Sequence, residues 1–335
     1  MRFDRRWPAL LAVLAFCFAA SGQSADSHAL IYKKKYIMGT VFEIAAYGEP
    51  GQASLAIEKA FQRIVEMDDL MSNFKPESPL SQLNRSAHFH TEKVPPDLYR
   101  VIQEAIQFSQ LSDGKFDITV GPVVSLWKTA LSGGSIPSQS EQQKARACVG
   151  YDKVELTSPD QVAFLSPCLE LDLGAIGKGY AVDRAGEILL SLGIQNAFIN
   201  AGGSTLLAKG TPPGKNGWPV HLRDPSHKLD PYVVLKNESV STSEQSQPSI
   251  LGRDSPGHII DPSTGKPLAT GYAVSVVAPT GTMSDGLSTT LLLIGPNAGK
   301  AVINRMPGVS AAWVSNKTEV ETATNGPQIL FTQTR

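Results

Sequence analysis

The stretch Asp172-Leu-Gly-Ala-Ile-Gly-Lys-Gly-Tyr-Ala-Val-Asp183 decides how the middle of this 335-residue chain folds. Residues 170–173 predict a short strand, and the residues after the glycines predict a helix to about Leu192. Glycines let a backbone approach a ligand closely, amides at a helix N-terminus attract anions, and Lys178 adds a positive charge. The stretch therefore suits a di- or triphosphate, although its spacing is neither GxGxxG nor GxxxxGK followed by Ser or Thr. Taken alone, it is also explained as a tight strand-to-helix turn.

Strands and helices alternate on both sides of this stretch. On its N-terminal side, residues 30–47 predict one or two strands with a break at Met38-Gly39-Thr40, and residues 53–71 and 96–113 predict helices. On its C-terminal side, helices are expected after Ser284 and Asn297, and strands at residues 197–200, 220–222, 232–235, 274–278 and 311–314. Residues 132–140 and 245–257 are expected to be long loops. Because no clear linker interrupts this alternation, the sequence predicts a single mixed α/β domain over residues 30–330, with mixed sheets flanked by helices.

The composition describes a folded globular protein that does not bind nucleic acid. The chain has 30 Lys and Arg against 31 Asp and Glu, and 41% of its residues are hydrophobic. This near balance leaves no basic excess for binding a phosphate backbone, so nucleic acid is excluded as the expected partner.

The N-terminus has the pattern of a secretory signal peptide. Three arginines precede an apolar run from Ala9 to Ala20, and small residues follow it. We expect residues 1–22 to be a signal peptide, with an uncleaved membrane anchor as the alternative. Removing them leaves 27 basic and 30 acidic side chains, a net charge near −3. Of the cysteines, Cys148 and Cys168 would then remain, either as one disulfide or as two buried small side chains.

Two further segments carry candidate chemistry. Ser284-Asp285-Gly-Leu-Ser288-Thr289 would open a helix on which Asp285, Ser288 and Thr289 share one side. Their oxygen atoms suit Mg²⁺, although an ordinary helix cap would have the same composition. His258-Ile-Ile-Asp261-Pro-Ser-Thr-Gly265 contains a lone histidine before a turn, and such a histidine serves either catalysis or structure.

Taken together, these segments resemble the ApbE family of FAD:protein FMN transferases. The resemblance extends from about Met38 to Gly295 and rests on motifs that occur in the family's order. Besides the segments already quoted, they are Met38-Gly-Thr40, Ser72-Asn-Phe-Lys-Pro-Glu-Ser78 with Leu83-Asn84, Gly114-Lys-Phe-Asp-Ile-Thr-Val-Gly-Pro122, Asn200-Ala-Gly-Gly203 and Gly217-Trp218.

The resemblance implies a fold, a reaction and a set of site residues. The implied fold is the single α/β domain of the family, similar to a T-fold. The implied enzyme is a periplasmic, Mg²⁺-dependent transferase. If the N-terminal segment stays uncleaved, the enzyme would be anchored to the inner membrane. It cleaves FAD, attaches FMN through a phosphoester to a Thr or Ser hydroxyl of a target protein, and releases AMP. Such a target would be a subunit of a membrane redox complex or a periplasmic flavoprotein.

The family's site residues transfer to matching positions of this chain. His258 would activate the acceptor hydroxyl, and Asp285 would be the second catalytic residue. Asp285 would also bind the metal ion, and the other metal ligands would be Thr289, Ser288 and the Ala175 carbonyl. FAD contacts would fall at Met38, Phe74, Lys115, Phe116, Asp117, Asp172, Lys178 and Ile259.

This sequence departs from the family at two places. Phe74 stands where a Tyr is usual, and Glu244-Gln245-Ser246 stands where a Gly and a Tyr are common. Two other functions would use the same residues: hydrolysis of FAD to FMN and AMP, and storage of FAD by a non-catalytic periplasmic protein.

Overall fold

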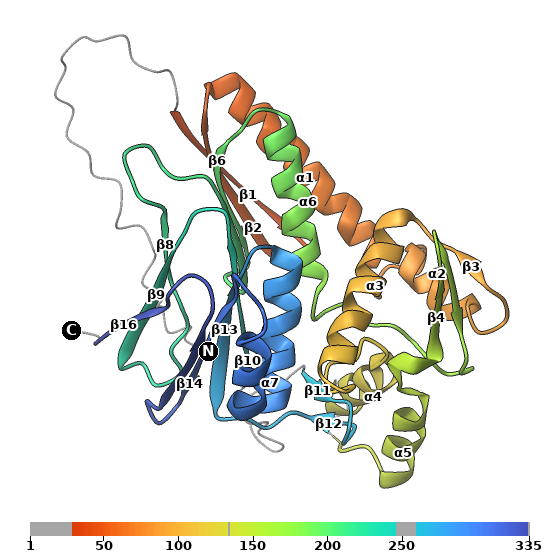
Figure 1. Ribbon diagram of the computed structural model, residues 1–335. Helices are drawn as coiled ribbons and strands as arrows, with labels where there is room; N and C mark the ends of the chain where they lie inside the picture. The colour runs from red at the N-terminus through yellow and green to blue at the C-terminus, as the bar shows by residue number, and fades with distance from the viewer. Residues whose placement is uncertain (1–28, 133–134, 246–258, 334–335) are drawn as a thin grey trace, which may run out of the picture.

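A large antiparallel sheet forms the centre of the molecule. The computed structural model describes residues 29–132, 135–245 and 259–333 (Figure 1). Each strand of the large sheet pairs antiparallel with its neighbours. In sheet order the strands are β1 (Ala29–Ile37), β2 (Thr40–Gly48), β6 (Asn196–Ala201), β7 (Thr205–Lys209), β10 (Ser239–Glu244), β13 (Tyr272–Ala278), β14 (Ser310–Ser315) and β15 (Val320–Thr324).

Three long helices cover one face of this sheet. They are α1 (Pro50–Met71), α6 (Gly177–Ser191) and α7 (Gly281–Ile303), and α6 lies between the other two (Figure 1). In α1 the residues Ile57, Phe61 and Ile64 are fully buried at helical spacing, because this side of the helix packs into the core. In α7 the helix is interrupted at Gly295, whose φ of 76° lies outside the helical region, directly before Pro296.

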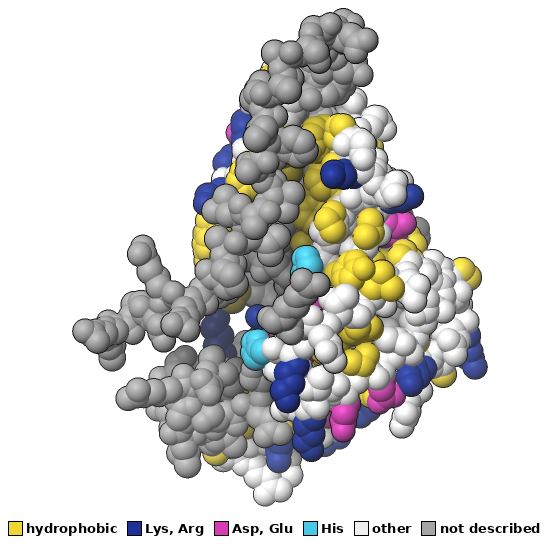
Figure 2. Space-filling view, turned by 90° about the vertical axis from the view of Figure 1, so that its left-hand side faces the viewer, with side chains coloured by type: hydrophobic (Ala, Val, Ile, Leu, Met, Phe, Trp, Pro, Cys, Tyr) yellow, Lys and Arg dark blue, Asp and Glu magenta, His cyan; other side chains and the backbone are white. Residues whose placement is uncertain are grey.

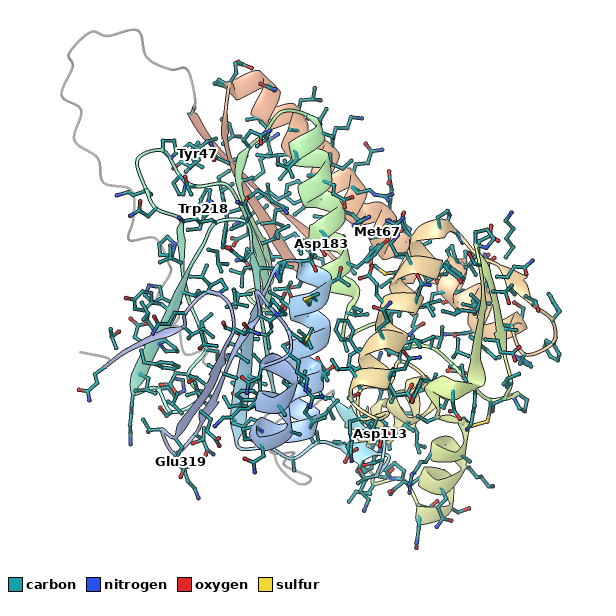
Figure 3. All side chains as sticks on the ribbon, viewed as in Figure 1. Tyr47, Met67, Asp113, Asp183, Trp218 and Glu319 are labelled. Carbon is teal, nitrogen blue, oxygen red and sulfur yellow. A yellow bond between two sulfur atoms is a disulfide. The ribbon has the colours of Figure 1, made fainter. Side chains whose placement is uncertain are left out.

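A small sheet covers part of the other face. Its order is β16 (Leu330–Gln333), β9 (Leu229–Leu235) and β8 (Trp218–His221). The Trp218 ring stacks on the ring of Phe198 in β6, with 5.4 Å between the ring centroids. The centroid of the Tyr47 ring in β2 lies 5.9 Å from that of Trp218, and Figure 3 labels these two residues. Figure 2 looks onto this side of the molecule, where hydrophobic side chains gather in the upper and middle part of the face.

The remaining helices form a smaller part beside the long helices. This part contains α2 (Pro79–Ser86), α3 (Pro96–Leu111), α4 (Gly121–Ser132), α5 (Gln139–Cys148) and a short 3₁₀ turn at Tyr151–Lys153. Its strands are β3 (Glu92–Lys93), β4 (Val154–Thr157) and β5 (Gln161–Phe164), and the hairpin of β11 (Ile260–Asp261) and β12 (Lys266–Pro267) lies against α4. Cys148 at the end of α5 is joined to Cys168 by a disulfide, which decides between the two alternatives for these residues.

The structure confirms the predicted α/β class and corrects some of its details. The expected helices at 53–71 and 96–113 and the strand break at residues 38–40 are present as α1, α3 and the β1–β2 turn. The expected strand at 170–173 is wrong, since this segment makes only a single parallel bridge, between Glu170 and Val120. The expected mixed sheets are wrong as well, because every pair of described strands is antiparallel.

The structure revises the bounds of one expected loop and of one expected helix. The expected loop at 132–140 is shorter, because α4 extends to Ser132 and α5 begins at Gln139. The expected loop at 245–257 lies outside the described residues except for Gln245. Helix α7 starts at Gly281 rather than at Ser284, and its interruption at Gly295 divides it into two helical segments, in agreement with the separate helices expected after Ser284 and after Asn297. Within the described part of the chain, no helix is long and apolar enough to span a membrane.

Candidate active site

A pocket of about 610 Å³ opens where the β1–β2 turn, the end of α1 and the start of α6 meet. Four predicted FAD contacts line it, namely Met38, Phe74, Asp172 and Lys178. The other lining residues are Gly39, Asp68, Met71, Ser72, Asn73, Lys75, Leu173, Gly174 and Gly177. The structure thus brings together residues from three distant segments of the sequence.

Two asparagines fix the wall of the pocket that carries Asp172. The Asn84 side chain accepts a hydrogen bond from the Leu171 amide at 2.8 Å and donates one to the Leu171 carbonyl at 3.0 Å. Asn73 donates a second bond to the same carbonyl at 3.1 Å. Because Leu171 has no strand partner, these amide groups replace the backbone pairing and hold the residue before Asp172 in place.

The glycines of the 172–183 stretch serve two purposes. Gly174 and Gly177 line the pocket, as a site for a phosphorylated ligand would require. Gly179 instead permits close packing of helices, because a Cβ there would lie 2.2 Å from the Gly281 carbonyl oxygen. Gly179 therefore has a structural role, whereas phosphate binding beside Gly174 and Gly177 stays a prediction.

Asp285 joins this stretch from helix α7. Its carboxylate accepts hydrogen bonds from the Gly179 amide at 2.8 Å and from the Thr205 hydroxyl at 3.1 Å. The residue is 5% exposed and forms no ion pair within the described residues. Burial raises the pKa of the Asp285 carboxyl, and the positive charge of Lys178 opposes that rise. A cation beside this carboxylate would offset the cost of its burial.

Asp183 fixes the start of the helix that carries Asp285. It lies on α6 where this helix meets α7 (Figure 3), and its carboxylate accepts hydrogen bonds from the Gly281 amide at 2.7 Å and the Thr282 amide at 2.8 Å. A carboxylate at a helix N-terminus satisfies unpaired amides and stabilises the helix. The last residue of the 172–183 stretch therefore positions α7 relative to the pocket.

A hydroxyl group from β10 contacts two of the candidate metal ligands. Ser243 lies 2.7 Å from the Ser288 hydroxyl and 3.1 Å from the Thr289 hydroxyl. Ser288 also donates a bond to the Asp285 backbone carbonyl at 2.9 Å. Sequence reasoning missed Ser243 and Thr205 as parts of the site. The pattern Ser239-Val-Ser-Thr-Ser243 contained a signal for the first, since every second residue of a strand faces the same side.

The donor atoms fit a hard divalent cation. Asp285, Ser288 and Thr289 offer only oxygen atoms, and the half-buried Ala175 lies two residues before Gly177, where α6 begins. No cluster of three or more His, Cys, Asp or Glu residues suited to a metal occurs in the part of the chain that the structure describes. A cation here would be held by one carboxylate and by neutral oxygens, and this donor set differs from a cluster of three or more His, Cys, Asp or Glu side chains.

The other predicted site residues do not line the pocket. Phe116 is 2% exposed and its ring packs edge-on against Phe108 at 5.7 Å. Asp117 is also buried, which raises its pKa, and it accepts hydrogen bonds from the Thr119 and Tyr151 amides. Both side chains are engaged within the protein.

Three more predicted residues belong to the region of the β11–β12 hairpin. Lys115 donates a hydrogen bond to the Ser263 hydroxyl at 2.8 Å, in the turn of the hairpin. Ile259 is buried directly before β11. His258 lies outside the described residues.

Phe74 forms an exposed aromatic surface at the pocket. Its side chain is 80% exposed, and the Lys128 ammonium of α4 lies 4.0 Å from the ring centroid. A large exposed aromatic ring beside a pocket is suited to stack on a planar ligand.

The fold and the site define a class of α/β proteins whose pocket, beside a buried carboxylate, is suited to a phosphorylated, planar ligand. Comparison with known proteins identifies the family, because the model of the ApbE family matches residues 38–313. The chain belongs to the ApbE family. It is 30% identical to a FAD:protein FMN transferase from Haemophilus influenzae, over 80% of this chain and 82% of that protein. It is 28% identical to one from Escherichia coli, over 89% of each chain.

Solved structures agree with this assignment. The flavin transferase ApbE from Vibrio cholerae superimposes with a TM-score of 0.78 at 26% identity, covering 89% of this chain and 98% of that one. The ApbE protein from Thermotoga maritima also gives a TM-score of 0.78, at 27% identity, covering 88% and 97%. The predicted family and fold are confirmed.

Proposed function

We propose that this protein is a flavin transferase that moves FMN from FAD to a hydroxyl group of another protein. One contact carries the proposal: the hydrogen bond from the Gly179 amide to Asp285. It joins the glycine-rich pocket wall to the candidate metal ligands, so the phosphates and the cation would share one site. The names of the relatives support FAD as the substrate and a protein as the acceptor.

The reaction breaks one bond of the FAD pyrophosphate. The oxygen of the acceptor Thr or Ser attacks the phosphorus of the FMN half, and the bond from that phosphorus to the bridging oxygen breaks. AMP leaves with the electron pair, and the hydroxyl loses its proton. His258 would take this proton, since a neutral imidazole can act as a general base.

The protein's own groups would position and neutralise the pyrophosphate. Lys178 lines the pocket and carries a positive charge, and the pocket lies at the N-terminal end of α6, which is the positive end of the helix dipole. Asp172 accepts a hydrogen bond from the Gly174 amide at 2.8 Å, which fixes the turn before α6. Such positioning accounts for most of the catalysis in phosphoryl transfer.

We further propose that Mg²⁺ is required. Asp285 and Thr289 would hold it, with Ser288 and the Ala175 carbonyl as additional ligands. When bound, the ion would withdraw charge from the pyrophosphate and stabilise the leaving AMP.

Export of the protein is part of the proposal. Residues 1–22 have the pattern of a signal peptide, and the Cys148–Cys168 disulfide is compatible with an oxidising compartment such as the periplasm. An acceptor would then be a periplasmic flavoprotein or a membrane redox subunit.

Incubating the mature protein with FAD and Mg²⁺, with and without a protein bearing an acceptor threonine, tests the function. AMP together with flavin bound covalently to the acceptor supports transfer. AMP with free FMN in both reactions would indicate a pyrophosphatase instead, and unchanged bound FAD would indicate storage. AMP release that survives Asp285→Ala with its dependence on Mg²⁺ intact would refute the metal assignment, and native transfer by His258→Ala would refute the role of His258.

A further inference from the structure

A connected chain of buried hydroxyl groups from β7, β10 and α7 ends at Asp285. Its four hydroxyl residues, Thr205, Ser239, Ser241 and Ser284, are all 0% exposed. The Ser284 hydroxyl lies 2.8 Å from those of Ser239 and Ser241. Ser241 donates to the Thr205 hydroxyl at 3.2 Å, and Thr205 donates to the Asp285 carboxylate at 3.1 Å. The hydroxyls therefore form a continuous path of hydrogen bonds to the carboxylate.

The direction of donation along this chain is fixed at its Asp285 end. In the ionised form that binds a cation, the carboxylate has no proton, so the Thr205 proton lies toward it. The Ser241 proton is used on Thr205, so the proton between Ser284 and Ser241 comes from Ser284. The Gly281 carbonyl, at 3.1 Å, is the more distant acceptor for Ser284. Hydrogen bonds aligned in one direction polarise and strengthen one another, so the chain strengthens the last bond, that of Thr205.

Two donors together fix the plane of the Asp285 carboxylate. Its Oδ2 atom accepts a hydrogen bond from the Gly179 amide at 2.8 Å, and its Oδ1 atom accepts the bond from Thr205. A carboxylate has about four acceptor positions, so others stay available for a cation. With the Gly179 bond alone, the group would be able to turn about its Cβ–Cγ bond. The Thr205 bond removes this freedom.

We propose that Thr205 is a positioning residue that orients Asp285 for a divalent cation, and that Ser241 acts through Thr205. The inference rests on the proposed function, in which Asp285 binds Mg²⁺. Groups that orient a metal ligand by a hydrogen bond typically change metal affinity by about 10- to 100-fold. The residues that line the pocket include neither Thr205 nor Ser241, so the two side chains would act on the cation and not on the flavin.

A purely structural explanation of the cluster makes a different prediction. Buried hydroxyls need hydrogen-bond partners, and the four hydroxyls provide partners for one another. If this were their whole purpose, removing one of them would lower the stability of the protein and leave its affinity for a cation unchanged. Cation binding therefore separates positioning from mutual satisfaction.

The test measures the binding of Mn²⁺ to the protein without FAD, from the paramagnetic resonance signal of the free ion. Mn²⁺ replaces Mg²⁺ as the probe, since both ions prefer oxygen ligands. Asp285→Ala defines the binding that belongs to the site. Thr205→Val keeps the shape and loses the hydroxyl, so we expect the dissociation constant for Mn²⁺ to rise by about 10- to 100-fold. Thr205→Ser keeps the hydroxyl and should restore binding close to that of wild type.

A double variant tests whether Ser241 acts through Thr205. Ser241→Ala alone should raise the dissociation constant for Mn²⁺ by about two- to fivefold, because it removes the bond that strengthens the donation by Thr205. Thr205→Val combined with Ser241→Ala should bind Mn²⁺ as Thr205→Val does, since the intermediate hydroxyl is already absent. Losses that multiply in the double variant would overturn the indirect role of Ser241.

Thr290→Val is the matched control. Thr290 is also 0% exposed, lies on the same helix as Asp285, and donates its hydroxyl hydrogen bond to the Gly286 carbonyl at 2.7 Å. Like Thr205→Val, the change removes one buried hydroxyl and keeps the shape of the side chain. It should cost comparable stability in urea denaturation and leave the binding of Mn²⁺ unchanged.

The outcomes separate the inference from the function on which it rests. Weaker Mn²⁺ binding in Thr205→Val, restored in Thr205→Ser and absent in Thr290→Val, supports the positioning role. Equal Mn²⁺ binding in wild type and Thr205→Val overturns it, and so do equal losses in Thr205→Val and Thr290→Val. If Thr205→Val does not fold, Ser241→Ala decides, and unchanged Mn²⁺ binding in that variant overturns the inference. A wild-type protein that binds no more Mn²⁺ than Asp285→Ala would refute the metal assignment itself.

Discussion

Replacing Ser243 by alanine probes whether the hydroxyls of β10 support a metal ion. The change removes one oxygen atom that contacts Ser288 at 2.7 Å and Thr289 at 3.1 Å. A neutral hydrogen bond contributes about 1 kcal/mol, so the free energy of unfolding should fall by about 1–2 kcal/mol. Groups that orient metal ligands typically change metal affinity by about 10- to 100-fold, so the Mg²⁺ concentration for half-maximal AMP release should rise by that factor.

Ser275→Ala is the matched control for this prediction. Ser275 is also buried, and its hydroxyl contacts Thr242 at 2.8 Å on the opposite face of β10. It should cost comparable stability in urea denaturation and leave the Mg²⁺ dependence unchanged. Equal Mg²⁺ dependence in wild type and both variants would refute the argument that Ser243 orients Thr289 toward a metal.

Three other predictions concern the pocket, the disulfide and a half-buried ion pair. Phe74→Ala should weaken FAD binding by about 3- to 10-fold through lost stacking, which a titration with FAD measures. Because the side chain is exposed, the free energy of unfolding should change by less than about 0.5 kcal/mol, which thermal unfolding measures. The double variant Cys148→Ser, Cys168→Ser should lower the free energy of unfolding by about 3 kcal/mol for a sequence separation of 20, measured in urea. Burial raises the pKa of Asp97, but hydrogen bonds from Tyr180 and Arg63 outweigh this and hold it below its usual value. The stability gained is therefore present above a pH of about 4 and lost as pH falls through the lowered pKa, so Asp97→Asn should cost about 1–3 kcal/mol at neutral pH and progressively less in acid.

Amphipathic elements of the fold were predictable from the sequence. Helix α1 and strand β2 bury one face each, and the apolar spacing shows that face directly. The missed elements lack this signal for identifiable reasons. Strand β10 has serines on the face toward α7, because that face carries a hydrogen-bonded cluster instead of a hydrophobic core. Helix α5 buries little, and only its capping box of Ser138 and Glu141 marked its start.

The site was predictable only in part. Single motifs did not show that Gly179 and Asp285, 106 residues apart, are in contact, and the family resemblance was needed to place them together. Even the resemblance gave no sign that the side chains of Phe116 and Asp117 are engaged within the protein. Burial is a property of the packed structure, and the spacing of these residues does not encode it.

The hydroxyl groups around Asp285 explain how a nearly neutral protein could bind a pyrophosphate. A divalent cation on one carboxylate leaves one positive charge, and Lys178 at the pocket adds another. Carboxylates at positions 288 and 289 would hold the cation more strongly but would make the site negative and repel the substrate. Neutral oxygens from Ser288, Thr289 and their partner Ser243 supply ligands and orientation without this charge. Buried hydroxyls therefore suit a site whose substrate is itself an anion, and the bulk charge of the chain, 30 basic against 31 acidic residues, gives no sign of such an arrangement.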